Sequence, residues 1–63
     1  MTTTKQKLYR QDTLAKDTLR RAGYDPSAVI KYCQLRIVEF TPVEALAYVM
    51  DISLTSAKAE LDD

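Results

Sequence analysis

The side chains that could take part in covalent or acid–base chemistry are few and scattered. The 63-residue sequence holds one cysteine, Cys33, and no histidine, so no imidazole is available to activate the thiol. Cys33 also falls on an apolar stripe, which is typical of an inert core thiol. No two carboxylates are placed for acid–base work, and there is no glycine-rich phosphate loop. These observations predict a protein that is not an enzyme, takes no small-molecule substrate and needs no cofactor.

The same composition limits metal binding and location. Without histidine, and with a single cysteine, zinc sites of the usual type are excluded. The absence of a disulfide framework is typical of an intracellular protein. The longest run without a charge has six residues, whereas a membrane span needs about 20, and no signal peptide is visible. We therefore expect a cytoplasmic protein with no metal and no membrane contact.

Side chains suited to binding are better represented. The chain has four tyrosines and no tryptophan, and tyrosine is enriched at protein interfaces. Residues 1–21 carry a net charge of +4 and residues 22–63 a net charge of −4, an asymmetry that can steer a partner. Tyr9 lies away from the apolar stripe of its segment, beside Lys5 and Lys16. The residues we expect to contact a partner protein are Tyr9, Arg10, Leu14, Arg20, Arg21 and Tyr24.

The signals for helix starts and stops indicate four helices, over residues 4–22, 26–38, 42–50 and 54–61. Thr3 with Gln6, and Thr41 with Glu44, match the capping box, and Asp25 offers a carboxylate N-cap before a proline. Gly23 and Asp51 stand where a helix would end in a left-handed residue. No run alternates apolar and polar residues for long enough to be a strand. The expected fold is an all-α compact bundle of four short helices in a single domain, 1–63, with a basic first helix, 4–22.

The spacing of apolar residues predicts the buried faces. The first helix has a stripe interrupted by Asp12, and the second helix is apolar nearly all round, which favours a central position. The stripe of the first helix comprises Leu8, Ala15, Leu19 and Ala22, and that of the second comprises Val29, Ile30, Cys33, Ile37 and Phe40. Leu14, Leu35 and Val38 lie off these stripes and predict a homodimer that covers them.

Residues 41–61 resemble a helix-turn-helix. The stretch Thr-Pro-Val-Glu-Ala-Leu-Ala-Tyr-Val-Met-Asp-Ile-Ser is similar to the first helix and turn of excisionase-like and MerR-type regulators. Asp51 replaces the usual glycine of the turn, and Glu60 stands at an inward position that Leu61 could fill instead. The resemblance implies binding to duplex DNA, although residues 41–63 have a net charge of −4. The implied contacts to the major groove are Ser53, Leu54, Thr55, Ser56 and Lys58. Lys5 and Lys7 of the basic first helix would contact the DNA phosphate backbone.

A second resemblance covers residues 19–50. Leu-Arg-Arg-Ala-Gly-Tyr followed by the next two helical segments is similar to the ubiquitin-associated domain, a three-helix bundle that binds a protein. Its ligand patch would carry over to Gly23 and Tyr24, and to Val49 and Met50. Ala22 departs from the methionine of that family's loop.

Two functions therefore remain open. The first is a small intracellular regulator that binds a partner protein, and accessory proteins of phages and mobile elements that inhibit a host protein are often of this size. The alternative is a helix-turn-helix transcriptional regulator that binds DNA.

Overall fold

The computed structural model describes residues 4–61 as four helices with no strand among them. Helix α1 covers Thr4–Arg21, α2 covers Pro26–Ile37, α3 covers Pro42–Met50 and α4 covers Leu54–Glu60. The all-α bundle is confirmed, and every described boundary falls within one residue of the expected one. Thr3, which we expected to cap α1, lies outside the described residues.

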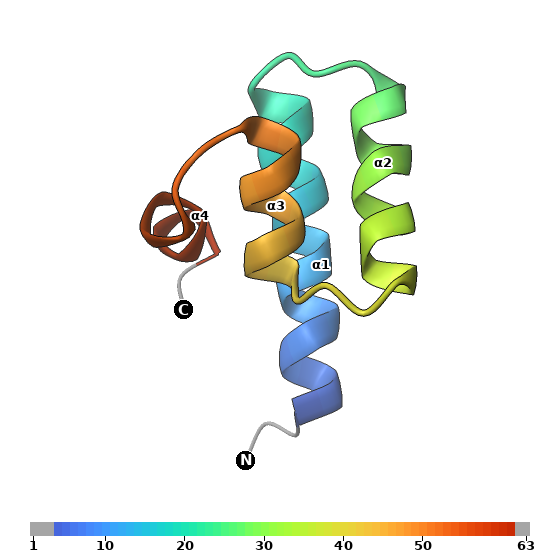
Figure 1. The fold of residues 1–63 in the computed structure, drawn as a ribbon, viewed down its shortest axis with the longest axis vertical. Coiled ribbons are helices and arrows are strands. Elements are labelled where there is room, and N and C mark those ends of the chain that lie inside the picture. Colours follow the sequence, from blue (N-terminus) through green and yellow to red (C-terminus); the bar gives the residue numbers. More distant parts are fainter. Residues whose placement is uncertain (1–3, 62–63) are drawn as a thin grey trace.

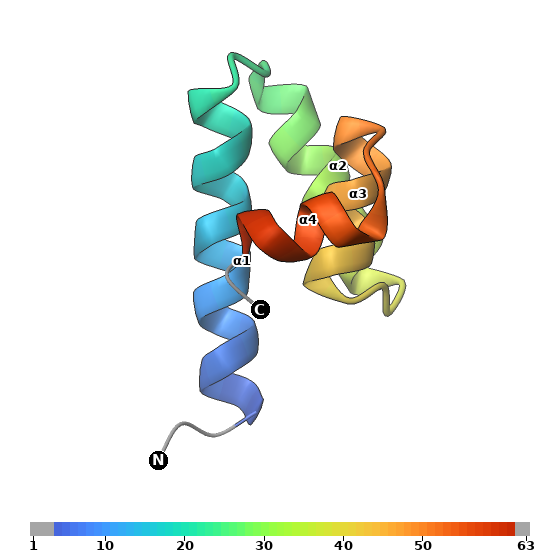
Figure 2. The same cartoon turned by 90° about the vertical axis from the view of Figure 1, so that its left-hand side faces the viewer.

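Helices α1, α2 and α3 run alongside one another, and α4 lies across α3 and α1 (Figures 1 and 2). Within residues 4–61, α1 and α3 each pack against all three other helices, whereas α2 packs only against α1 and α3. The expectation that α2 is the central helix is therefore wrong. No helix in the described part of the chain combines the length and the apolar content that a membrane crossing requires.

Three helices end in the same backbone arrangement. At each end a residue with positive φ is followed by an amide that bonds back to a carbonyl five residues earlier, the Schellman motif. The left-handed residues are Gly23 (φ 86°), Glu39 (φ 74°) and Asp51 (φ 55°). The returning bonds are Tyr24 N to Leu19 O at 3.0 Å, Phe40 N to Leu35 O at 3.1 Å, and Ile52 N to Ala47 O at 3.0 Å. The stops at Gly23 and Asp51 are confirmed, and the one at Glu39 was not expected.

The helix starts differ in quality. Thr41 Oγ1 accepts a bond from Glu44 N at 3.2 Å, and Glu44 Oε1 accepts one from Thr41 N at 3.0 Å, so the capping box of α3 is confirmed. Ser53 caps α4 by accepting a bond from Ser56 N at 3.1 Å. Asp25 stands at the N-cap of α2, but its side chain makes no capping bond and instead accepts one from the Ser27 hydroxyl. Asp25 therefore stands at the expected N-cap position before a proline, but the capping bond expected of its carboxylate is not formed.

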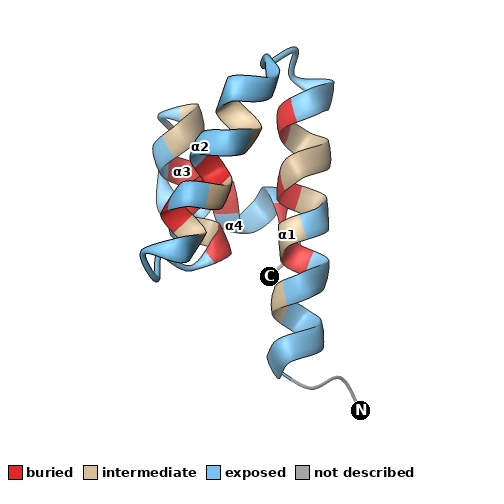
Figure 3. Ribbon diagram, turned by 90° about the vertical axis from the view of Figure 1, so that its right-hand side faces the viewer, coloured by how far each residue is buried: buried red, intermediate tan, exposed pale blue. Residues whose placement is uncertain are grey.

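The core is small and rich in alanine, which lets the helices approach closely. Figure 3 shows the buried residues of α1 on the side that faces the other helices. The buried apolar residues are Ala15, Leu19, Tyr32, Leu35, Ala45, Leu46, Ala47, Ala57 and Leu61. Leu61 is buried while Glu60 is exposed, as expected if Leu61 takes the inward position of α4.

The fully buried side of α2 lies about 140° around the helix from the centre of the expected stripe, although Val29 and Cys33 of that stripe pack partly against the core. Tyr32 and Leu35 are buried, whereas Ile30 is 58% exposed and Ile37 79% exposed. Apolar spacing alone favoured the wrong side because α2 is apolar nearly all round, and a polar partner on α1 decides the orientation. Ala22, expected in the core, is exposed.

The expected dimer patch is also wrong in its composition. Leu35 belongs to the core, and Leu14 packs against it from α1. Of the three residues, Val38 alone is exposed, at 61%.

Candidate protein-binding surface on α1 and α2

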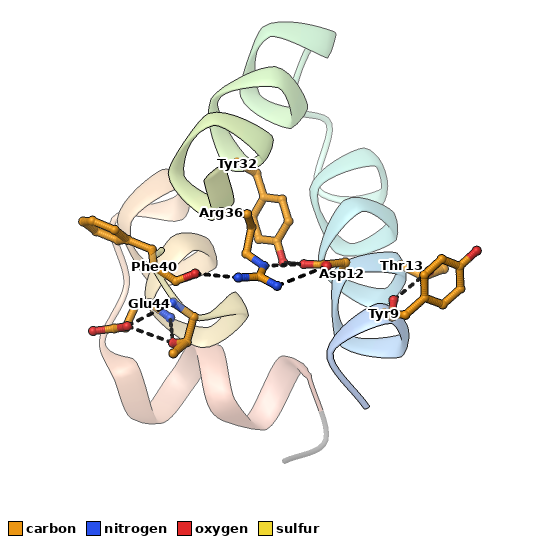
Figure 4. A network of polar contacts seen from close by, with 8 residues as sticks. Tyr9, Asp12, Thr13, Tyr32, Arg36, Phe40 and Glu44 are labelled. Carbon is orange, nitrogen blue, oxygen red and sulfur yellow. Dashed lines mark hydrogen bonds and ion pairs between the residues drawn. The ribbon is translucent and has the colours of Figure 1, made fainter. Parts of the chain in front are cut away.

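A polar cluster joins α1 to α2. The Tyr32 hydroxyl donates to Asp12 Oδ1 at 2.5 Å, and Arg36 Nε donates to the same oxygen at 2.8 Å. Arg36 Nη1 also donates to the carbonyl oxygen of Phe40 at 2.8 Å, so one guanidinium connects α1 to the end of α2 (Figure 4). Asp12, which interrupts the apolar stripe of α1, is therefore the partner that turns Tyr32 inward.

The ionisation of the cluster suits a structural role. Burial, together with the hydrogen bond to Asp12, raises the pKa of Tyr32, which keeps its hydroxyl protonated as a donor. The hydrogen bond to the Asp12 carboxylate raises the pKa of Arg36, which stays charged. Tyr32 and Arg36 on α2 both donate hydrogen bonds to Asp12 on α1, so the cluster orients α2 on α1.

About two turns beyond Asp12 along α1, next to the α1–α2 connection, the two helices enclose an open cleft of about 370 Å³. Arg20 lines it from the last turn of α1, Tyr24 from the connection, and the start of α2 supplies its apolar floor. The lining residues are Arg20, Tyr24, Pro26, Val29 and Ile30. Two of the six expected protein contacts, Arg20 and Tyr24, thus meet at one site. Arg20 is only weakly engaged, since its ion pair with Asp17 spans 3.8 Å between two well-exposed side chains.

The other expected contacts are distributed around α1. Tyr9 is 75% exposed, and its ring points away from the other helices (Figure 4). It shares one side of α1 with Lys16 and Arg20, which follow it by seven and eleven residues, or about two and three turns. Arg10 and Arg21 are exposed on other sides of α1. Arg21 pairs with Asp17 at 4.0 Å and, with Met50 and Glu60, lines a shallow depression away from the cleft.

Sequence reasoning missed the exposed apolar surface of α2. Ile30 and Ile37 face solvent, although we expected them in the core. On the α3 side, the rings of Phe40 and Tyr48 meet edge to face at 6.4 Å, and Lys31 Nζ lies 5.8 Å from the Tyr48 ring centre. The signal was present in the sequence, because a helix apolar all round has more apolar surface than two neighbours can cover.

The residues expected to contact DNA are mostly exposed on α4. Leu54 is 57% exposed, and Thr55 and Lys58 are exposed as well. The hydroxyls of Ser53 and Ser56 bond to each other at 3.1 Å while Ser53 caps the helix. Lys7 and Lys58 line one groove of about 400 Å³, which α1 and the start of α3 form and which Lys58 borders from α4. The exposed Lys5 does not line this groove.

The patch implied by the ubiquitin-associated resemblance is divided. Gly23 ends α1, and Tyr24 lines the cleft. Val49 and Met50 pack partly against the core, and neither lines the cleft.

No protein-family model, curated protein or solved structure matches the chain. Residues 4–61 contain no group of three or more side chains that could hold a metal ion.

Proposed function

We propose that this chain is a non-enzymatic regulator that binds a partner protein through the cleft between α1 and α2. The observation that carries the proposal is the meeting of Arg20 and Tyr24 over the apolar floor formed by Val29 and Ile30. Arginine and tyrosine are two of the three residue types that dominate binding hot spots, which form around well-packed pockets.

The cleft also indicates the chemistry of the partner. A volume of about 370 Å³ accepts one or two side chains, and its floor favours an apolar anchor. Arg20 is the one charged residue among those that line the cleft. Arg20 can exchange its exposed contact with Asp17 for a partner carboxylate at a cost of at most about 1 kcal/mol. The partner therefore presents an apolar side chain flanked by acidic residues.

A capture experiment with matched variants tests this proposal. Immobilised protein is exposed to a lysate of the source cells, and bound proteins are compared for wild type, Tyr24→Ala and Tyr48→Ala. Tyr48 serves as the control because it is an exposed tyrosine on α3 that does not line the cleft. We expect a partner that binds wild type and Tyr48→Ala equally and Tyr24→Ala at least about 30-fold more weakly. A partner that binds all three alike, or no partner beside tight binding to duplex DNA, would contradict the proposal.

Binding to duplex DNA is the second candidate, supported by one arrangement. Helix α4 follows α3 after only three residues, 51–53, and Lys58 lies on the same groove as Lys7. The outward side of α4 carries mainly small neutral residues, Thr55, Ser56 and Ala59, which include none of the side chains that read bases best. A mobility-shift assay over a range of salt concentrations discriminates: binding through Lys58 must weaken with salt and with Lys58→Glu. Binding that is undetectable even at low salt removes this candidate.

A further inference from the structure

An outer stripe of apolar residues, Pro26, Ile30, Cys33 and Ile37, runs along α2 from the cleft towards the end of the helix. Each member follows the last by three or four residues, so they lie within about 60° of one another and are neighbours on the helix surface. Ile30 is 58% exposed, Ile37 is 79% exposed, and Cys33 between them is half-buried. Only Pro26 and Ile30 line the cleft. The apolar surface that a partner can cover therefore continues about two turns beyond it.

Basic side chains of α1 lie alongside the cleft end of this stripe. Arg20 lines the cleft itself. Lys16 follows Asp12 by four residues and precedes Arg20 by four, so along α1 it lies between the polar cluster and the cleft. Within residues 4–61, the half-buried Lys16 has no hydrogen-bond or ion-pair partner. Both bases are therefore available to a partner carboxylate.

The acidic residues of this region compensate these bases only in part. Asp12 is already bonded to two residues of α2. Asp17 pairs with Arg20 across 3.8 Å between exposed side chains, a contact that a partner carboxylate can replace. Asp25 and Glu39, both exposed, stand at the two ends of α2. A partner is therefore attracted where it places acidic groups opposite the two bases of α1, and repelled where it places them at the ends of α2.

The backbone of the site favours a helical partner over an extended one. Residues 4–61 include no strand, so they offer no sheet edge with which the backbone of an extended segment could pair. A helix satisfies its own backbone groups before it binds. Alternate spacings of four and three residues, as in the outer stripe, are also those at which two helices interlock along a seam.

We propose that the segment bound by the cleft is an amphipathic α-helix of the partner that lies along the whole outer stripe of α2. One apolar side chain of this helix fills the cleft, others cover Ile37, and its acidic flank faces Lys16 and Arg20. The inference rests on the proposed function, because the same cleft holds the helix at one end. It adds a contact at Ile37, which a partner confined to the cleft does not make.

Synthetic peptides of about 18 residues test the shape and the charge of the partner. The probe is a fluorescein-labelled, alanine-based helix with leucines at the spacing of the outer stripe and glutamates along one flank, titrated with the full chain and followed by fluorescence anisotropy. We expect saturable binding that weakens at least about 10-fold when lysines replace the glutamates. It should weaken at least about 30-fold when a central alanine is replaced by proline, which breaks the helix. No binding of the glutamate peptide, or equal binding of all three, would overturn the proposal.

Variants of the chain locate the bound peptide. Ile37→Asn should weaken binding of the glutamate peptide at least about 10-fold, whereas the same change at Leu54, an exposed apolar residue of α4, should not. Lys16→Glu should weaken it at least about 5-fold, whereas Arg21→Glu, exposed on another side of α1, should not. Equal effects within either pair would place the peptide elsewhere and overturn the proposal.

The helix and the proposed function fail in different ways. Tyr24→Ala removes a contact inside the cleft, and Ile37→Asn removes one outside it. Peptide binding that is lost with Tyr24→Ala and kept with Ile37→Asn would retain the cleft and overturn the helix. Binding that is lost with Ile37→Asn and kept with Tyr24→Ala would overturn both, because the peptide would then lie outside the cleft.

Discussion

Helices α2 and α3 are both apolar on most sides in the sequence, yet the fold uses them in opposite ways. Helix α3 packs against three helices and buries Pro42, Ala45, Leu46 and Ala47. Helix α2 packs against two helices, buries Tyr32 and Leu35, and exposes Ile30 and Ile37. The difference shows that apolar content indicates how much surface a helix can bury, and its neighbours decide how much it does bury.

The two helices also differ in what fixes their orientation. Helix α3 is held by apolar contacts on several sides, while α2 is oriented by the bonds that Tyr32 and Arg36 make to Asp12. One polar cluster therefore leaves the rest of α2 available for binding.

Truncation of an apolar side chain should give the largest difference in unfolding free energy between a variant on α3 and a variant on α2. Leu46 on α3 is fully buried, so Leu46→Ala should lower the free energy of unfolding by about 2–5 kcal/mol. A core of this size supplies only about 3–5 kcal/mol, so much of this variant should be unfolded. Ile37→Ala on α2 should change the value by less than about 0.5 kcal/mol at concentrations where the chain is monomeric. Urea unfolding followed by circular dichroism measures both, and equal losses would contradict the comparison.

Loss of the Tyr32 hydroxyl tests the polar attachment of α2. Tyr32→Phe keeps the ring and removes the bond to the Asp12 carboxylate, which should lower the unfolding free energy by about 1.5–3 kcal/mol. The pKa of Tyr32 is raised in the folded state above its ordinary value of 10.0. Its contribution should therefore be complete below pH 10 and decline as the pH rises above that value. We expect a steeper alkaline loss of stability in wild type than in Tyr32→Phe, and identical alkaline profiles would argue against the bond.

Helix starts and stops could be predicted because their chemistry is local. Thr41 and Glu44 lie within one turn of each other, and Gly23 and Asp51 are residue types suited to a left-handed conformation. The orientation of α2 could not be predicted, since Tyr32 and Asp12 are 20 residues apart and their pairing depends on the packing of two helices.

The candidate site could be predicted in part because Arg20 and Tyr24 lie close together in the sequence. Arg20 and Tyr24 were chosen for residue type and for the basic charge of the first helix, and the turn at Gly23 brings them to one cleft. Leu14 packs partly against the core and does not line the cleft. Ile30 was assigned to the core and lines the cleft instead, because the Asp12 contact rotates α2.

At their N-termini, as in their buried residues, α3 should contribute more to the stability of the fold than α2. Thr41→Ala removes the hydroxyl that accepts the bond from Glu44 N, while the backbone N–H of residue 41 can still donate to Glu44, and it should lower the free energy of unfolding by about 1 kcal/mol. Asp25→Ala removes a carboxylate that makes no capping bond, so its effect should stay within about 0.5 kcal/mol. Thermal unfolding of the two variants side by side measures the difference. A larger loss for Asp25→Ala would indicate that this carboxylate caps α2 in solution.

The pKa of Glu44 is lowered by its bonds to the backbone and hydroxyl of Thr41. The capping box should therefore be complete above the ordinary value of 4.5 and weaken as the pH falls below it. Glu44→Gln should flatten this part of the acid profile, and an unchanged profile would contradict the assignment.

Substitutions at the ends of the two helices should differ least in their effect on stability, and both should stabilise the fold. Glu39 follows α2 and Asp51 follows α3, both with left-handed backbone, which costs a residue other than glycine about 1–2 kcal/mol. Glu39→Gly should therefore stabilise the fold by about 0.5–1 kcal/mol, after the greater freedom of glycine in the unfolded chain is subtracted. Asp51→Gly should gain less, because aspartate tolerates this conformation better than glutamate does.

Gly23→Ala is the control with the opposite sign: no atom lies within 4 Å of the added carbon, so a loss of about 1 kcal/mol would measure the backbone cost alone. Chemical unfolding of the three variants at monomeric concentration tests the order, and a loss of stability in Glu39→Gly would contradict the left-handed end of α2.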